Sequence, residues 1–298
     1  MGLWFVSVAA ATEVCASFGD AGDSIVVEDI PAVESSGVAH RGDGVYFTHD
    51  DEEGDAALHA FTLDGEYLGA QAVTNASNVD WEDLAVGPCP ATVDAADCVW
   101  IGDVGDNDEV RDEIVVYVVP LSSEASETAV ACALRYPEGK RHDAETVLVD
   151  PDGVLRVVTK EGDGEAHVFR VDAPRCDGDA DTLEEEAELA LGSPVTGGAM
   201  RADGLAVVLV SESEAWLWTG CVNWAREPVE IELGSQQQRE AVTFAPDGSL
   251  VITSEGDPFR VWSAPCADTK EAKCPACGCG GGDGAWLLLP LAWLRRRR

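Results

Sequence analysis

Residues 143–162 have the sequence DAETVLVDPDGVLRVVTKEG, and this stretch decides the fold. A run rich in β-branched residues, ETVLV, is followed by the triplet PDG at residues 151–153 and then by a second such run, LRVVTK. Short β-branched runs on either side of a Pro-Asp-Gly turn are typical of two antiparallel strands. The stretch therefore predicts a β-hairpin.

The same pattern occurs at other places along the chain. Four stretches align on a turn glycine that lies eight residues after one marked position, and the marked positions are Ser36, Glu145, Thr196 and Glu240. A fifth copy, NVDWEDLAVGP at residues 78–88, places Glu82 at this position and has an enlarged turn after it. A third strand-like run follows in every unit. The chain is thus built from repeats.

Five units, spaced 44 to 63 residues apart, predict an all-β protein with a single β-propeller of five blades over residues 21–268. No long run has the 3.6-residue period of an α-helix. A six-bladed ring is the alternative, in which the strand-like run SIVVEDI at residues 24–30 and an unrecognised unit form another blade.

The amino-acid composition limits which classes of partner the protein is expected to bind. The 298 residues are 46% hydrophobic, which is enough for a sizeable core, and their formal net charge is −37. Such a charge disfavours nucleic acid and anionic membrane surfaces and suits divalent cations. We expect a monomer that binds a small-molecule or protein ligand and no nucleic acid.

The ten cysteines indicate an oxidising compartment. Cys89 and Cys98 flank the enlarged turn of the second unit, and we expect them to form a disulfide. Three others follow the third strands of their units and indicate structural pairing, with Cys132 as one candidate partner: Cys176, Cys221 and Cys266. The remaining connectivity is left open.

Both ends of the chain indicate export. Residues 1–20 contain an apolar run that ends in small residues, as in a signal peptide. Residues 269–298 form a Cys- and Gly-rich linker, a ten-residue apolar stretch and four arginines. Ten residues are too few to span a bilayer, which takes roughly 20. An apolar stretch followed by arginines is typical of a sorting signal. We expect the protein to contact the membrane only through this tail.

This tail resembles the C-terminal sorting signals that myxosortase-type proteases process, over residues 274–298. The resemblance implies processing at Cys277 or Cys279 and attachment to the cell surface. A short anchor that is retained is the alternative.

In a propeller, the starts of the inner strands and the ends of the second strands converge on one face. Acidic side chains gather there, and the candidate metal ligands are Glu34, Asp80, Glu82, Asp143, Glu145 and Glu240. Strand alternation predicts that Glu82, Leu84 and Val86 share one face. Carboxylates so close together repel, so either some are protonated or a cation binds between them.

Oxygen ligands from several strands suit Ca²⁺, which accepts six to eight of them. The rim has no His/Cys cluster, which disfavours zinc, copper and iron. A second acidic loop, GDVGDNDEVR at residues 102–111, offers Asp103, Asp106, Asn107 and Arg111 to the same site. For both groups the alternative is that the carboxylates face water and only increase solubility.

The elements DWEDLAV, IGDVGDN, HDAETVLVDP and QREAVTF resemble a group of secreted bacterial propeller proteins, over roughly residues 30–265. In layout the chain is also similar to five-bladed calcium-dependent apyrases. That resemblance implies a central Ca²⁺ and hydrolysis of nucleoside di- and triphosphates. The few cations near the expected rim, Lys160, Arg111, His142 and Arg239, depart from what a phosphate site requires.

Two functions follow from these observations. The first is a cell-surface recognition or scaffold module that binds Ca²⁺, in which exposed aromatics such as Trp216, Trp218, Trp224 or Trp262 would contact a ligand. The second is a metal-dependent hydrolase of a phosphoester or lactone. There Glu145 or Glu240 would act as the base and Lys160 would neutralise developing charge. A serine-hydrolase motif, GxSxG, is absent.

Overall fold

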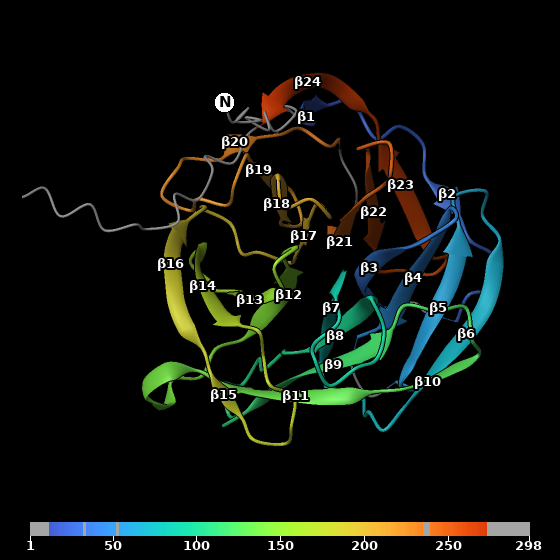
Figure 1. Ribbon diagram of the computed structural model, residues 1–298. Helices are drawn as coiled ribbons and strands as arrows, with labels where there is room; N and C mark the ends of the chain where they lie inside the picture. Colours follow the sequence, from blue (N-terminus) through green and yellow to red (C-terminus); the bar gives the residue numbers. More distant parts are fainter. Residues whose placement is uncertain (1–11, 32–33, 52–53, 235–238, 273–298) are drawn as a thin grey trace, which may run out of the picture.

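The computed structural model describes residues 12–31, 34–51, 54–234 and 239–272. In this part of the chain regular structure is almost entirely strand, and the only helix is a 3-10 turn, Pro137–Gly139. No helix within these ranges is long and apolar enough to cross a membrane. Five sheets lie around a central axis as the blades of a propeller (Figure 1).

The first two blades have five strands each. Blade one contains β3 (Ser35–Gly42), β4 (Val45–Asp50), β5 (Ala57–Thr62), β6 (Tyr67–Thr74) and β10 (Ser126–Thr128). Blade two contains β7 (Trp81–Pro88), β8 (Asp97–Asp103), β9 (Ile114–Pro120), β11 (Val130–Arg135) and β15 (Asp181–Thr182). The short outer strands β10 and β15 pair in parallel with β6 and β11, and each comes from chain that follows the next blade's inner strands. Neighbouring blades are thereby joined at their outer edges.

The other three blades have four strands each. Blade three contains β12 (Ala144–Val149), β13 (Val154–Thr159), β14 (Glu165–Asp172) and β16 (Glu184–Ala190). Blade four contains β17 (Gly197–Met200), β18 (Ala206–Val210), β19 (Ala215–Thr219) and β20 (Val229–Glu230). Blade five contains β21 (Arg239–Phe244), β22 (Leu250–Ser254), β23 (Arg260–Ala264) and β2 (Ile25–Val26). The hairpin predicted over residues 143–162 is therefore β12 and β13.

The ring closes through the N-terminal segment. Strand β2 pairs antiparallel with β23 as the outermost strand of blade five, so the run SIVVEDI completes a blade begun at the other end of the chain. The inner strands contact one another in the cyclic order β3, β7, β12, β17, β21. Five blades are confirmed, and the six-bladed alternative is wrong.

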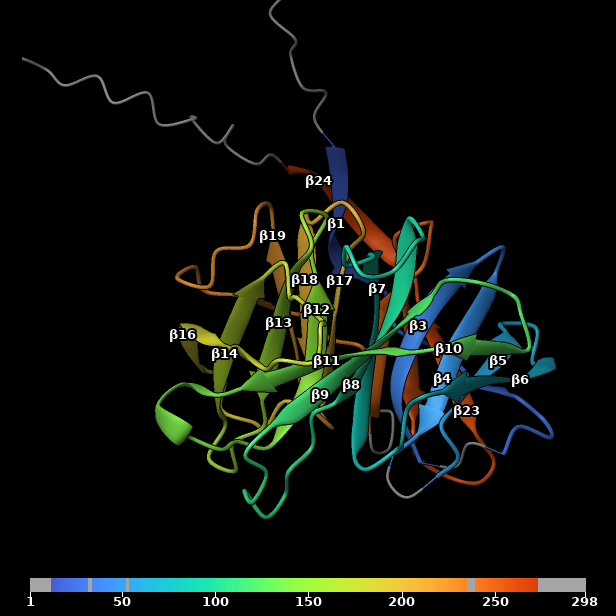
Figure 2. The ribbon, with the colours of Figure 1, turned by 60° about the horizontal axis from the view of Figure 1, so that its bottom comes forward.

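A two-stranded ribbon lies apart from the blades. Strand β1 (Thr12–Phe18) pairs antiparallel with β24 (Cys266–Ala272), and the Cys15–Cys266 disulfide joins them. Arg201, in a turn after an inner strand, donates a hydrogen bond to the Glu13 carbonyl at 2.9 Å. The ribbon thus lies on the face where the inner strands end, and Figure 2 shows it projecting from one side of the ring.

Apolar side chains fill the spaces between blades. Trp81, fully buried, packs with its ring against His49 of blade one and Tyr117 of blade two. Trp216, Trp218 and Trp224 are also buried, and Trp262 is partly buried against the core. These tryptophans therefore form no exposed aromatic platform.

Three disulfides cross-link the described part of the chain. The predicted Cys89–Cys98 bond is confirmed, and Cys132 pairs with Cys176, which joins blade two to the chain leaving blade three. With Cys15–Cys266, these bonds indicate an oxidising environment. The proposed processing residues Cys277 and Cys279 lie outside the described residues.

Candidate functional site

Three of the five inner strands share an irregularity at the aligned acidic position. In blade three Ala144 pairs with Thr159 and Thr146 with Val158, so Glu145 is the extra residue of a β-bulge. Glu82 and Glu240 are the corresponding extra residues of β7 and β21. A bulge bends the strand and turns a side chain out of the regular alternation. Three glutamates are therefore re-aimed at the same rim.

The bulge overturns the predicted alternation. Glu82 does not share a face with Leu84 and Val86, because the extra residue shifts the register and places Trp81 on that face. In β12, likewise, Ala144 packs in the same cluster as Val147 and Val149. The glutamates consequently lie above the apolar rows and not within them.

Glu82 and Glu145 meet at the centre of this rim. Their side chains are 3% and 4% exposed and are hydrogen-bonded to each other. Burial raises the pKa of Glu82 well above its ordinary value, and the charges of Glu145, Asp51 and Asp80 raise it further. Since two buried carboxyls share one hydrogen bond, Glu82 is the partner that carries the proton.

Lys160 sets the charge of the other partner. Its Nζ lies 2.5 Å from Glu145 Oε1. Burial raises the pKa of Glu145, and Lys160 partly opposes that shift. Burial also works against the charge on Lys160, but the neighbouring Glu145, Glu82 and Asp143 outweigh it and raise its pKa. Glu145 is thus paired with a cation that favours its ionised form.

Two groups of oxygens share Glu82. One consists of Asp51, Asp80 and Glu82, and the other of Glu82, Asp143 and Glu145. Within each group one oxygen per residue lies within 4.8 Å of the others, which is close enough to surround an ion. Asp51 comes from blade one, Asp80 and Glu82 from blade two, and Asp143 and Glu145 from blade three. We call these five residues the acidic cluster.

Gly105 closes the cluster from the side. A Cβ atom at this position would collide with the carboxylates of Glu82 and Asp80, so a larger residue would displace these two side chains. Its amide also donates to the Asp80 carbonyl at 3.3 Å. Neither Gly105 nor Asp51 was among the residues predicted from sequence. Asp51 comes directly after the end of β4, and Gly105 lies within the GDVGDN element.

The second acidic loop is held by hydrogen bonds and an ion pair within the loop and by a hydrogen bond to the acidic cluster. Arg111 forms an ion pair with Asp103 at 2.8 Å and donates to the Gly105 carbonyl at 2.7 Å. The Asp106 carboxylate accepts the amides of Val110 and Arg111, and the Asp106 amide donates to Asp143 Oδ1, each at 2.8 Å. These contacts position Gly105 and Asp143.

The remaining groups of this loop differ in burial. Burial raises the pKa of Asp103, although Arg111 opposes the shift. Asn107 is exposed to solvent. Asp106, its neighbour in the chain, is buried.

Two predicted ligands lie outside the acidic cluster. Glu34 is exposed. Glu240 is half-buried, and burial together with the charges of Glu145 and Glu255 raises its pKa to about 8. In blade four Thr196 occupies the aligned position and donates to the Arg239 carbonyl at 2.7 Å, which joins blade four to blade five. The structure thus brings together Asp80, Glu82, Asp143 and Glu145 from the predicted set.

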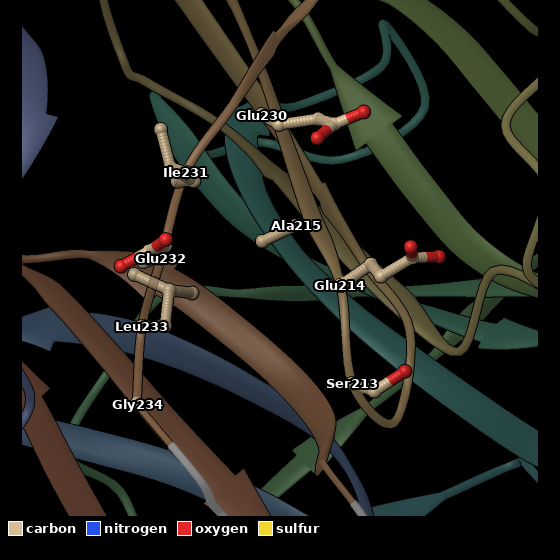
Figure 3. A pocket seen from close by; sticks show the side chains of 8 residues that line it. All are labelled: Ser213, Glu214, Ala215, Glu230, Ile231, Glu232, Leu233 and Gly234. Atoms are coloured by element: carbon tan, nitrogen blue, oxygen red, sulfur yellow. The ribbon is translucent and has the colours of Figure 1, made fainter.

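A pocket of about 450 Å³ lies on the rim between blades four and five (Figure 3). Its walls are residues 213–215 and 230–234, and Arg239 donates to the carbonyls of Glu214 at 3.0 Å and Gly234 at 3.3 Å. Glu214, Glu230 and Glu232 line it with carboxylates. None of the acidic cluster residues lines this pocket.

The fold and the cluster together define a five-bladed β-propeller with carboxylates of three blades gathered on the rim where its inner strands begin. Comparison with known proteins found no matching family and no matching curated protein.

Proposed function

We propose that this protein is an exported, surface-attached propeller that binds Ca²⁺ in the acidic cluster and serves as a recognition or scaffold module. The observation that carries the proposal is the position of Glu82, whose carboxyl belongs to both groups of oxygens. An ion in either group would draw on carboxylates from two neighbouring blades. Binding would therefore stabilise the contact between those blades.

The chemistry of the ligands favours calcium. All five side chains offer carboxylate oxygens, which hard cations prefer, and Ca²⁺ tolerates irregular geometry better than Mg²⁺. Without an ion, Glu82 must hold a proton because its neighbours are negatively charged. A divalent cation would replace that proton and relieve the repulsion.

The disulfides support export, since such bonds persist outside the reducing cytosol. The apolar segment and arginines at residues 285–298 support attachment at the cell surface. The scaffold role is supported by the position of the pocket between blades four and five, which is not lined by Glu82, Glu145 or Lys160.

A metal-dependent hydrolase of phosphoesters or lactones is the second candidate. It is favoured by Lys160, a cation at the edge of the cluster, and by Glu240, whose pKa of about 8 suits proton transfer. A bound ion would polarise the substrate or a water molecule.

Thermal unfolding in EDTA, followed by titration with CaCl₂, tests the ion site. A ligand that binds only the folded chain must raise the melting temperature. Glu82→Gln should abolish this rise while leaving the melting temperature in EDTA unchanged or higher, because glutamine imitates the protonated side chain. The control is Glu184→Gln on the exposed edge strand β16. A melting temperature indifferent to calcium would refute the site.

Glycine substitutions offer an independent test. Gly105→Ala should weaken calcium binding at least tenfold, because the new methyl group would displace Glu82 and Asp80. Gly162→Ala is the matched control, since nothing lies within 4 Å of a Cβ there.

A screen of phosphoesters and lactones with Glu145→Gln and Glu240→Gln separates the two functions. Turnover that both variants abolish would identify the hydrolase.

A further inference from the structure

The opposite mouth of the central channel holds a second pocket, of about 390 Å³. The ends of all five inner strands line it, with His40, Val86, Val149, Met200 and Phe244 as one residue from each blade. Residues 82 to 88 cover the length of β7, so at about 3.3 Å per residue this mouth lies roughly 20 Å from the acidic cluster. The pocket is therefore separate from the proposed ion site.

Its lining combines apolar side chains with polar ones, among them Arg41, Asp97 and Asp150. Val86, Val149, Met200 and Phe244 present hydrocarbon or aromatic surface to the pocket. Small-molecule sites have this composition, with a small number of polar groups that fix the orientation of the ligand. The volume is near the lower end for such sites and suits one ring with a short chain.

Arg41 supplies the charge of the pocket. It forms no ion pair with any residue in the described part of the chain, and its guanidinium lies 5.6 Å from the centre of the Phe47 ring. This is unusual in a protein of net charge −37, where carboxylates are abundant. Asp150, also in the lining, is already paired with Arg156 at 3.1 Å, and Asp97 lies at the exposed edge.

His40 contributes a ring to the lining beside Arg41. Its Nε2 is buried and has no hydrogen-bond partner, although buried polar atoms rarely remain unpaired. The ring packs against Tyr46 with 5.0 Å between centres, and burial lowers the pKa of His40, so the imidazole is neutral near pH 7. A neutral imidazole accepts or donates one hydrogen bond at this position.

We propose that this mouth binds a small amphipathic carboxylate. Its carboxylate would bind Arg41, and its apolar body would lie against Val86, Val149, Met200 and Phe244. An arginine–carboxylate hydrogen bond is among the stronger contacts available to a ligand, and an apolar body gains from leaving water.

Calorimetric titration with 4-phenylbutyrate tests the proposal, with 4-phenylbutanol and 4-phenylbutylamine as neutral and cationic probes of the same size. The carboxylate should bind at least tenfold more tightly than the alcohol, a difference of about 1.4 kcal/mol. The amine should bind most weakly. Equal binding of acid and alcohol, or no binding of the acid at millimolar concentration, would overturn the proposal.

Two variants assign the site. Arg41→Gln should reduce carboxylate affinity to that of the alcohol, whereas Arg260→Gln, an equal change of charge on the exposed face of β23, should leave it unchanged. Ala202→Trp, at the exposed edge of the pocket, should weaken acid and alcohol alike. Unchanged carboxylate affinity in Arg41→Gln would refute the assignment. All affinities should be the same in EDTA and in calcium, which keeps this result independent of the ion site.

Discussion

The carboxylate of Asp83, in the inner strand of blade two, accepts a hydrogen bond from the backbone amide of Val147, in the inner strand of blade three, at 3.0 Å. Its other oxygen accepts the amide of Leu84 at 2.8 Å. Asp83 is fully buried, and burial raises its pKa well above the ordinary value. One side chain thus satisfies amides of two neighbouring blades directly beneath the acidic cluster.

Asp83→Ala should therefore destabilise the propeller. Each buried amide left without a partner costs about 1–3 kcal/mol, and two are affected. Urea denaturation should show a clear loss of unfolding free energy. Asp83→Asn keeps a side-chain oxygen and should lose less. Equal stability of the two variants would show that the contact between blades contributes little.

Stability without calcium should fall as pH rises. The pKa values of Glu82, Asp83 and Glu240 are raised in the folded protein, the last to about 8, so the folded chain holds protons that the unfolded chain releases. Their contribution is complete below the unfolded value near 4 and is lost as pH rises through the folded values. Carboxyls with a lowered pKa, such as Asp181, titrate below this range.

Urea denaturation in EDTA between pH 5 and pH 8.5 measures this loss. Glu82→Gln should flatten the profile, because glutamine cannot release a proton, and Glu184→Gln should not. Calcium affinity should increase over the same range as the competing proton leaves. A profile that rises with pH would contradict the assignment of the proton to Glu82.

Lys160→Gln should strengthen calcium binding severalfold. Lys160 Nζ and an ion in the cluster would compete for Glu145, and removing the ammonium group lowers the repulsion that the ion meets. Titration calorimetry at pH 8 measures the change. Lys140→Gln, which removes an exposed cation paired with Glu185, is the control. Unchanged binding in Lys160→Gln would place Lys160 outside the reach of the ion, and weaker binding would contradict the expected competition.

The disulfides should differ in their effect on stability. Cys15–Cys266 spans 251 residues and Cys89–Cys98 spans 9. In the chain-entropy description, closing loops of these lengths stabilises the fold by ~5 and ~3 kcal/mol. The double variant Cys15→Ser/Cys266→Ser should therefore lose more unfolding free energy than Cys89→Ser/Cys98→Ser. The reverse order would show that the β1–β24 ribbon adds little to the ring.

Repetition made the blades and much of the rim predictable. Glu82 and Glu145 occupy the same place in aligned units, so their convergence follows from the ring. Other features depend on contacts that no repeat displays. Strand β2 has only two residues and pairs with a strand more than two hundred residues away, so its role in closing blade five was not evident.

The predicted directions of the acidic side chains were wrong for a related reason. Alternation assumes a regular strand, and the bulges at Glu82 and Glu145 break it at the acidic position. Gly105 joins the site only because its backbone touches Glu82 and Asp80, a closeness that neither motif nor spacing reveals.

The β1–β24 ribbon also gives the molecule a polarity. Thr12 and Ala272 are paired in it, on the face where the inner strands end. Anything joined to the chain beyond either residue is connected to that face. A propeller held on a surface by such a connection presents its acidic cluster outward, toward the medium, and keeps the pocket beside Arg41 on the side of the tether.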